Sequence, residues 1–226
     1  MIPIRDTIQA QRTAWMVRLL CGVNVGLFVL ELLQGARLDA FLYRFGVVPA
    51  YWTLTSPADL LQGSWLLATL VTSQFLHGGV LHLGSNLLYL WVFGDNVEDR
   101  LGHGRFLMFY LGSGLIAGLT QLLMQPHSSV PMIGASGAIA GVLGAYFLCF
   151  PFARVKTLVP WFLTIEFVEL PAFVFLGLWF FLQWLQGMTA IGQVAEVGGV
   201  AWWAHVGGFI SGLVLVTVLA PRRRHF

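Results

Sequence analysis

The chain has 226 residues, of which 58% are hydrophobic and only 10% are charged, whereas soluble globular domains carry about a quarter charged residues. This composition excludes an ordinary soluble enzyme and indicates an integral membrane protein. The formal net charge of +2 is too small to indicate a nucleic-acid-binding protein, so no nucleic acid partner is expected.

Apolar stretches long enough to form membrane-spanning helices, which need roughly 20 mostly apolar residues, occupy most of the chain. There are six of them, over residues 14–33, 82–100, 105–124, 136–151, 168–187 and 199–220. We therefore predict an all-α fold, a bundle of six transmembrane helices that forms a single integral membrane domain. The whole chain (1–226) divides into a short N-terminal segment (1–13), a six-helix core (14–220) and a basic tail (221–226).

The basic residues indicate how this bundle is oriented in the membrane. Of the 12 Lys and Arg residues, all but Arg37 and Arg44 fall on alternate connections that start with the N-terminal segment. Cytoplasmic connections carry the excess of Lys and Arg. Both termini are therefore expected to be cytoplasmic.

Two connections have a pattern of their own. The longest, from Gln34 to about Leu81, is rich in proline and aromatic residues, which suggests short elements in the outer membrane interface. The stretch "FARVKTLVPWFLTIEFVELPA" is expected on the cytoplasmic side, where Pro160 and Pro171 prevent one continuous helix.

Polar residues recur at one depth in three of the predicted helices. Ser136 begins the fourth one, which spans only about 22 Å against a hydrocarbon core of about 30 Å, so Ser136 lies below the outer surface. His205 precedes Pro221 by 16 residues and reaches a similar depth, and His82 and Asn86 fall in the outer half of the second stretch. Polar side chains at this depth are costly and are functional candidates.

Each of these residues also has a purely structural interpretation. Ser136 in "GASGAIAG" can be a packing residue, His205 in "WWAHVGGF" can bridge two helices, and His82 with Asn86 can be a hydrogen-bonded pair on one helical face. The residues expected to pack helices together near the site are Gly134, Gly137, Gly141 and Gly208. A metal shared by His82 and His205 would lack the third protein ligand of a usual catalytic site, so no metal is expected.

The four polar residues together supply what hydrolysis of a peptide bond requires. Ser136 is the candidate nucleophile, His205 the candidate base, and His82 with Asn86 the candidate donors to a developing oxyanion. The sequence places no acidic residue at this depth to orient His205, so we expect a catalytic dyad rather than a triad. No cofactor is expected.

The motifs "HGGVLHLGSN", "GASGAIAG" and "AHVGGF", in this order, resemble those of the rhomboid family of intramembrane serine proteases, over about residues 46–220. The resemblance implies cleavage of single-pass membrane proteins within or beside their transmembrane segment, in the lipid bilayer, here the inner membrane of a bacterium. It implies that Ser136 and His205 are catalytic. It also implies that His82, Asn86 and the backbone N–H of Ser136 form an oxyanion hole, and that "VEDRLG", with Glu98, is structural.

Several positions depart from the family pattern. Ala140 stands where some members have a tyrosine that stacks on the catalytic histidine, so any stacking on His205 must come from elsewhere or be absent. Ala68 and Thr69 replace a Trp-Arg pair, and Val200 replaces a glycine. The aromatic-rich stretch 168–187 is interpreted as a mobile gate for substrate, with lipid-facing anchoring as the alternative.

Two functions of other classes remain open. One is a proteolytically inactive rhomboid-like protein that binds other membrane proteins. The other is a small-solute transporter, which would be expected to show matched halves with broken helices. Such halves are not visible in the sequence.

Overall fold

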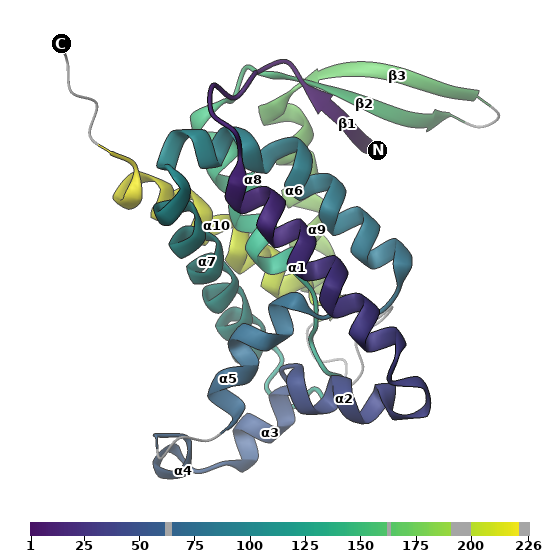
Figure 1. Ribbon diagram of the computed structural model, residues 1–226, viewed down its shortest axis with the longest axis vertical. Helices are drawn as coiled ribbons and strands as arrows, with labels where there is room; N and C mark the ends of the chain where they lie inside the picture. The colour runs from purple at the N-terminus through teal and green to yellow at the C-terminus, as the bar shows by residue number, and fades with distance from the viewer. Residues whose placement is uncertain (62–64, 162–163, 191–199, 222–226) are drawn as a thin grey trace.

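A computed structural model describes residues 1–61, 65–161, 164–190 and 200–221. It shows a bundle of long helices with a small sheet at one end and short helices at the other (Figure 1). The long helices are α1 (Trp15–Leu32), α6 (Val80–Leu101), α7 (His103–Met124), α8 (Ser136–Cys149), α9 (Ala172–Ala190) and α10 (Trp202–Leu219). Each lies on one of the six predicted stretches.

Short helices fill the long connection between α1 and α6, as the prolines and aromatic residues there suggested. They are η1 (Gly35–Arg37), α2 (Leu38–Phe45), α3 (Pro49–Leu54), α4 (Pro57–Leu61), α5 (Trp65–Thr72) and η2 (Ser73–Phe75). The segment Trp65–Phe75 is bent by 79° against α6.

Not all six long helices meet the requirements for crossing a membrane by themselves. Among the described residues, four helices do so by length and composition, namely α1, α7, α9 and α10, and a fifth span results if the bent pair that ends in α6 is counted as one. Helix α8 has 14 residues, or about 21 Å. The mainly helical membrane fold is confirmed, whereas a count of six spans is not.

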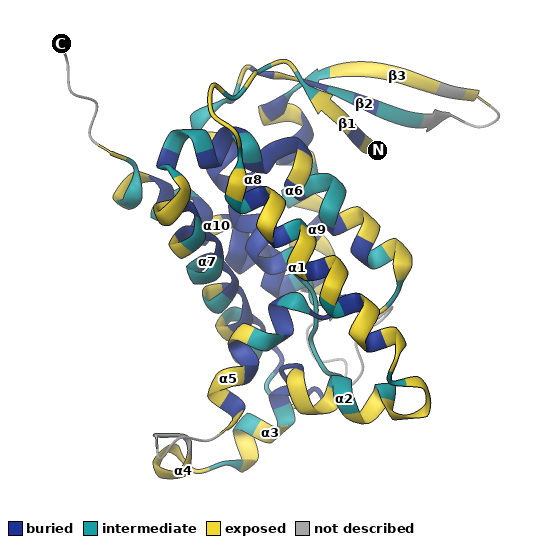
Figure 2. Ribbon diagram, in the orientation of Figure 1, coloured by how far each residue is buried: buried dark blue, intermediate teal, exposed yellow. Residues whose placement is uncertain are grey.

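Helix α8 is the centre of the bundle. All residues from Gly137 to Tyr146 are buried (Figure 2), because α6, α7, α9 and α10 all pack against it. A helix that is apolar on every side has no polar face to turn to water, so it is buried in a protein core or spans a membrane. Its contact with α10 is a backbone contact, since a Cβ added to Gly208 would lie 2.1 Å from the carbonyl oxygen of Gly137.

The prediction of an all-α fold was wrong in one respect, because the structure contains a three-stranded antiparallel sheet. Its strands are β1 (Ile2–Asp6), β2 (Arg154–Trp161) and β3 (Thr164–Pro171), in the order β1-β2-β3. Residues 168–171, predicted to begin the fifth span, belong to β3, and α9 starts only after Pro171. The prolines exclude a helix through this region, and the pairing of β2 with β1 joins segments about 150 residues apart, which no local pattern reveals.

Polar contacts fasten the N-terminal segment to the bundle. The Asp6 carboxylate accepts hydrogen bonds from the Tyr146 hydroxyl and, at 2.8 Å, from the Asn96 side-chain amide. These bonds tie β1 to α8 and α6. The segment 1–13 is therefore part of the folded domain.

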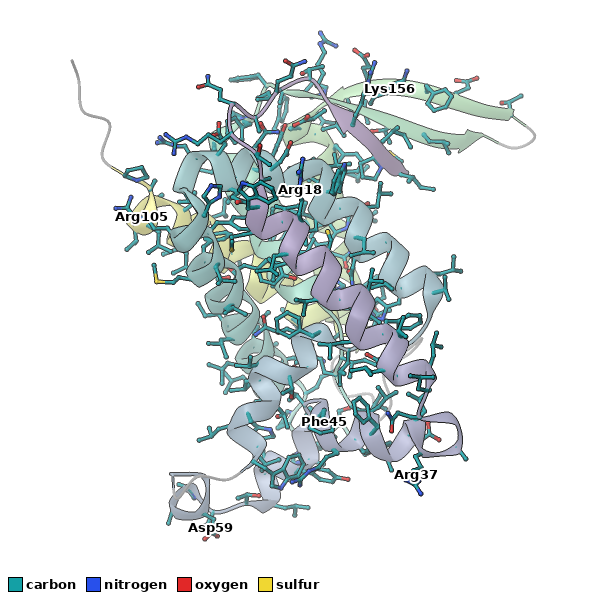
Figure 3. The ribbon with its side chains drawn as sticks, viewed as in Figure 1. Arg18, Arg37, Phe45, Asp59, Arg105 and Lys156 are labelled. Carbon is teal, nitrogen blue, oxygen red and sulfur yellow. The ribbon has the colours of Figure 1, made fainter. Side chains whose placement is uncertain are left out.

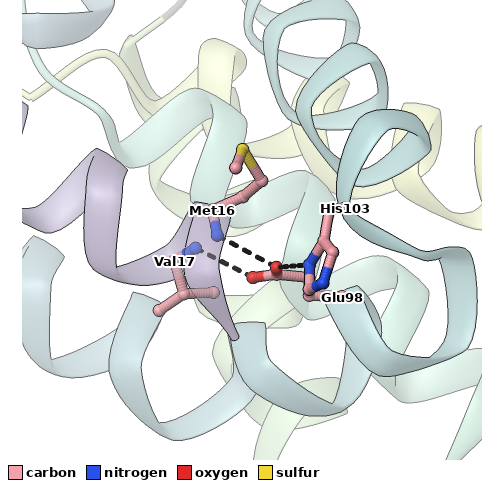
Figure 4. A network of polar contacts seen from close by, with 4 residues as sticks. All are labelled: Met16, Val17, Glu98 and His103. Carbon is pink, nitrogen blue, oxygen red and sulfur yellow. Dashed lines mark hydrogen bonds and ion pairs between the residues drawn. The ribbon is translucent and has the colours of Figure 1, made fainter. Parts of the chain in front are cut away.

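The first turn of α1 is held by a carboxylate from α6. The backbone N–H groups of Met16 and Val17 each donate to Glu98 at 2.9 Å, and Glu98 also pairs with His103 (Figure 4). A helix N-terminus has N–H groups without partners inside the helix and a positive dipole end. The Glu98 carboxylate accepts hydrogen bonds from two of these N–H groups and places a negative charge at the positive end of the dipole.

Candidate active site

The four polar residues singled out in the sequence line one cavity. It has a volume of about 600 Å³ and lies between α6, α7, α8, α9 and α10, and Ser136, His205, His82 and Asn86 all border it. None of the described residues that line the cavity is Asp, Glu, Lys or Arg. The polar side chains of its described lining are those of serine, histidine, asparagine, glutamine and aromatic residues.

Ser136 is the first residue of α8, and the segment before it is fixed by backbone hydrogen bonds. The N–H of Gly134 donates to the carbonyl oxygen of Ser73 at 2.9 Å, and Met132 forms an antiparallel bridge with Val47. Gly134 has φ +125°, a conformation that residues with a Cβ rarely adopt. The chain can thus turn sharply into α8 and present Ser136 to the cavity.

His205, in the first turns of α10, contacts Ser136 directly. Its Nε2 lies 2.8 Å from the Ser136 Oγ, the distance of a good hydrogen bond. His205 is 9% exposed. The close approach of α10 to α8 at Gly208 makes this contact possible, because bulkier residues there would separate the two helices.

His82 and Asn86 lie one turn apart on α6 and offer hydrogen-bond donors to the same cavity. The Nδ1 of His82 accepts the N–H of Gly78 at 3.3 Å, so in the neutral ring the proton is on Nε2. A Cβ added to Gly134 would lie 2.8 Å from that Nε2 and 3.6 Å from the Ser136 Oγ, so both atoms border one small space. The buried side-chain nitrogen of Asn86 has no hydrogen-bond partner.

The glycines expected to pack helices have two different environments. Gly137 and Gly141 face α7, where an added Cβ would lie 2.7 Å from the Cβ of Ala117 and 2.4 Å from that of Ser113, and Gly208 faces α8. Gly134 is not in a helix. Its missing side chain leaves room for the His82 ring.

Sequence reasoning missed the residue that contacts the other ring nitrogen of His205. The side-chain oxygen of Gln183, on α9, lies 2.6 Å from Nδ1 of His205. The one available signal was that Gln183 is the first polar residue in the apolar run of α9. The same depth argument that singled out Ser136 applies to it.

Aromatic rings surround His205 although Ala140 cannot stack on it. The Trp179 ring, from α9, lies 5.8 Å from the imidazole at 36°, and the Trp202 ring lies 6.2 Å away, edge on. The ring contact absent at position 140 thus comes from α9 and from the start of α10.

The residues that the structure describes form no candidate metal centre. Within the described ranges, no group of three or more His, Cys, Asp or Glu residues is arranged to hold an ion. The rings of His82 and His205 border the cavity without a third such ligand among the lining residues.

The fold and the cavity define a polytopic membrane protein with a hydrogen-bonded Ser–His pair that lines a cavity between its helices. A family model described as a rhomboid domain matches residues 64–222, and the chain belongs to the rhomboid family.

Relatives with this domain come from several kinds of organism and organelle. Rhomboid protease GluP of Bacillus subtilis is 37% identical over 118 residues, which are 52% of this chain and 21% of GluP. Rhomboid protein 1, mitochondrial, of Saccharomyces cerevisiae is 28% identical over 205 residues, 88% of this chain and 51% of the yeast protein. Rhomboid-like protein 11, chloroplastic, of Arabidopsis thaliana is 27% identical over 217 residues, 96% of this chain and 69% of that protein. The chain thus spans only about a fifth of GluP and half of the yeast protein.

Proposed function

We propose that this protein is an intramembrane serine endopeptidase that cleaves single-pass membrane proteins within or next to their transmembrane segment. The observation that carries the proposal is the 2.8 Å contact between Ser136 Oγ and His205 Nε2 inside the cavity. Membership of the rhomboid family and the similarity to a relative named as a protease support it.

The reaction follows from the positions of the four side chains. His205 Nε2 takes the proton of Ser136 as Oγ attacks the scissile carbonyl carbon, and the carbonyl oxygen becomes an oxyanion. The Nε2–H of His82, the amide of Asn86 and the backbone N–H of Ser136 are the donors for that oxyanion. His205 then protonates the leaving amine, and water, activated by His205, hydrolyses the acyl-enzyme and regenerates the Ser136 hydroxyl. No cofactor takes part.

The substrate has to reach the cavity from the bilayer and expose a peptide bond. Backbone groups in a membrane helix are already paired, so substrates with small or helix-breaking residues near the cut are favoured. We assign substrate entry to α9, because it lines the cavity and only 28% of its most apolar 18 residues are buried, against 56% for α10; α1 is as little buried as α9 but lends no residue to the cavity. The less enclosed helix is the easier one to displace.

The distribution of charge supports the proposed orientation. Arg18, Arg105 and Lys156 lie at the sheet end of the bundle, whereas Arg37 lies at the opposite end (Figure 3). The cluster Arg222–Arg224 lies outside the described residues. We place the sheet end in the cytoplasm. In this orientation all six long helices cross the membrane, with α8 enclosed by the others, and both termini are cytoplasmic. Relatives come from bacteria, mitochondria and chloroplasts, so the family does not fix which membrane holds this chain. The inner membrane of a bacterium is our proposal.

The proposal is tested with purified protein in detergent and a labelled single-pass substrate. Ser136→Ala and His205→Ala should each abolish cleavage, while substrate binding and helix content stay unchanged. Ser211→Ala is the matched control, since this buried serine of α10 bonds to the Gly208 carbonyl and does not line the cavity. Wild-type protein that binds substrates without cutting them would identify an inactive rhomboid-like binding protein instead.

A further inference from the structure

The ring of His205 is held on both sides, and the two contacts come from different helices. Its Nε2 faces Ser136 of α8, and its Nδ1 faces the side-chain oxygen of Gln183 of α9 at 2.6 Å. Gln183 is itself buried, 8% exposed. This polar side chain is therefore shielded from solvent, and its position in the apolar helix α9 requires another explanation.

The two contacts together fix where the hydrogen of the neutral imidazole is. A base that accepts the Ser136 proton must have a free electron pair on Nε2, so its hydrogen must be on Nδ1. An Nδ1–H requires an acceptor, and the Gln183 side-chain oxygen provides one. If Nε2 carried the hydrogen instead, it would face the serine as a donor and could not remove its proton.

No carboxylate performs this task in the part of the cavity that the structure describes. The described lining residues include no Asp or Glu, and the rings of Trp179 and Trp202 next to His205 present no oxygen acceptor. In a Ser-His-Asp triad the aspartate accepts the Nδ1–H and selects the tautomer. The neutral amide of Gln183 stands in the corresponding place.

We propose that Gln183 is a positioning residue that holds His205 in the Nδ1–H tautomer, so that Nε2 is free to accept the proton of Ser136. This inference rests on the proposed function for its catalytic meaning, although the tautomer itself can be measured without any substrate. Because Gln183 is on α9, the packing of α9 against α10 becomes a condition for an active base.

The test compares three variants with the wild type. Gln183→Met has a similar length and no oxygen acceptor, and Gln183→Glu restores an acceptor. Gln186→Met is the matched control, because Gln186 is exposed on the same helix. For each protein we would measure kcat and KM with a labelled substrate, the rate at which a fluorophosphonate labels Ser136, and the ¹⁵N spectrum of the His205 ring, assigned by its loss in His205→Ala.

The expected pattern is specific to a positioning role. In Gln183→Met, kcat and the labelling rate should both fall about 10- to 100-fold, the effect of losing one buried hydrogen bond, with KM within about twofold. The His205 spectrum should move from the Nδ1–H tautomer toward a mixture. Gln183→Glu should regain most of the rate, and Gln186→Met should match the wild type.

Other outcomes separate this inference from the proposed function. An unchanged labelling rate and tautomer in Gln183→Met, or an Nε2–H tautomer in the wild type, would overturn the role of Gln183, and the wild-type spectrum decides even if the variant does not fold. A wild-type protein that cleaves nothing, but whose His205 tautomer depends on Gln183, would reject the protease function and leave the inference standing.

Discussion

At the scale of single residues, the sequence predicts the candidate site because polar groups are rare in this chain and costly in a membrane. Ser136, His205, His82 and Asn86 are predictable since each stands in an apolar stretch at a similar distance from a helix end, and they meet in one cavity. Gln183 satisfies the same criterion but has no motif around it. Its role depends on which atom of His205 it meets, and that depends on the packing of α9 against α10.

The donors of the proposed oxyanion hole allow a test at this scale. Asn86→Ala and His82→Ala should each lower kcat by roughly 10²-fold, because a donor that faces the developing charge is worth that much in transition-state stabilisation. The measurement is steady-state cleavage of a labelled single-pass substrate. Trp91→Phe, a change at an exposed position of the same helix, should have no effect. If both alanine variants kept full kcat, the oxyanion would have to be bound elsewhere.

At the scale of elements, backbone contact between α8 and α10 determines whether the serine and the histidine can meet. The small-residue pattern around Gly141 and Gly208 predicts such a contact, and an added Cβ at Gly208 has no room. The sheet could not be predicted in the same way. Pro160 and Pro171 exclude a helix, but nothing local identifies residues 2–6 as the partner of β2.

Substitution of one glycine should therefore affect stability and activity together. Gly208→Ala should destabilise the protein by about 1–3 kcal/mol or more through overpacking and lower cleavage by moving His205 away from Ser136. The measurements are thermal unfolding in detergent and the cleavage rate. The matched change Gly26→Ala, on α1, meets nothing within 4 Å and should be neutral or slightly stabilising. Equal behaviour of the two variants would contradict the role of the α8–α10 contact.

The contact of Glu98 with α1 should affect stability alone. Glu98→Ala leaves the N–H groups of Met16 and Val17 without their acceptor, which should cost about 2–4 kcal/mol of unfolding free energy. Asp99→Ala, which removes only an exposed bond to the N–H of Gln11, should cost less than about 1 kcal/mol. Chemical unfolding of both variants measures the difference. A loss of kcat in folded Glu98→Ala protein would show that this contact also shapes the cavity.

At the scale of the whole molecule, composition is sufficient to predict a helical membrane protein, since 58% of the residues are hydrophobic. The number of spans is harder to predict. Helix α8 is too short to cross by length alone, and the segment Trp65–Phe75 bends away from α6 instead of continuing it. Helix α8 depends on the neighbours that enclose it, and the bend before α6 depends on tertiary structure; hydropathy along the chain contains neither.

The proposed orientation predicts which exposed positions can be reached from each side of the membrane. In a background with Cys21→Ser and Cys149→Ser, Asp59→Cys at the α4 end should react with a membrane-impermeant maleimide in intact cells. Glu166→Cys in β3 should react only after lysis. Both positions are exposed, so accessibility differs only by side. The opposite pattern would invert the topology.

The pairing of β1 with β2 also determines the order in which this protein can be completed. Ile2 pairs with Leu158, so β1 must wait for a partner that is synthesised much later. At about 5–20 residues per second the delay is roughly 10–30 s. During that interval neither edge of β1 has a partner, and the arrival of β2 pairs one of them.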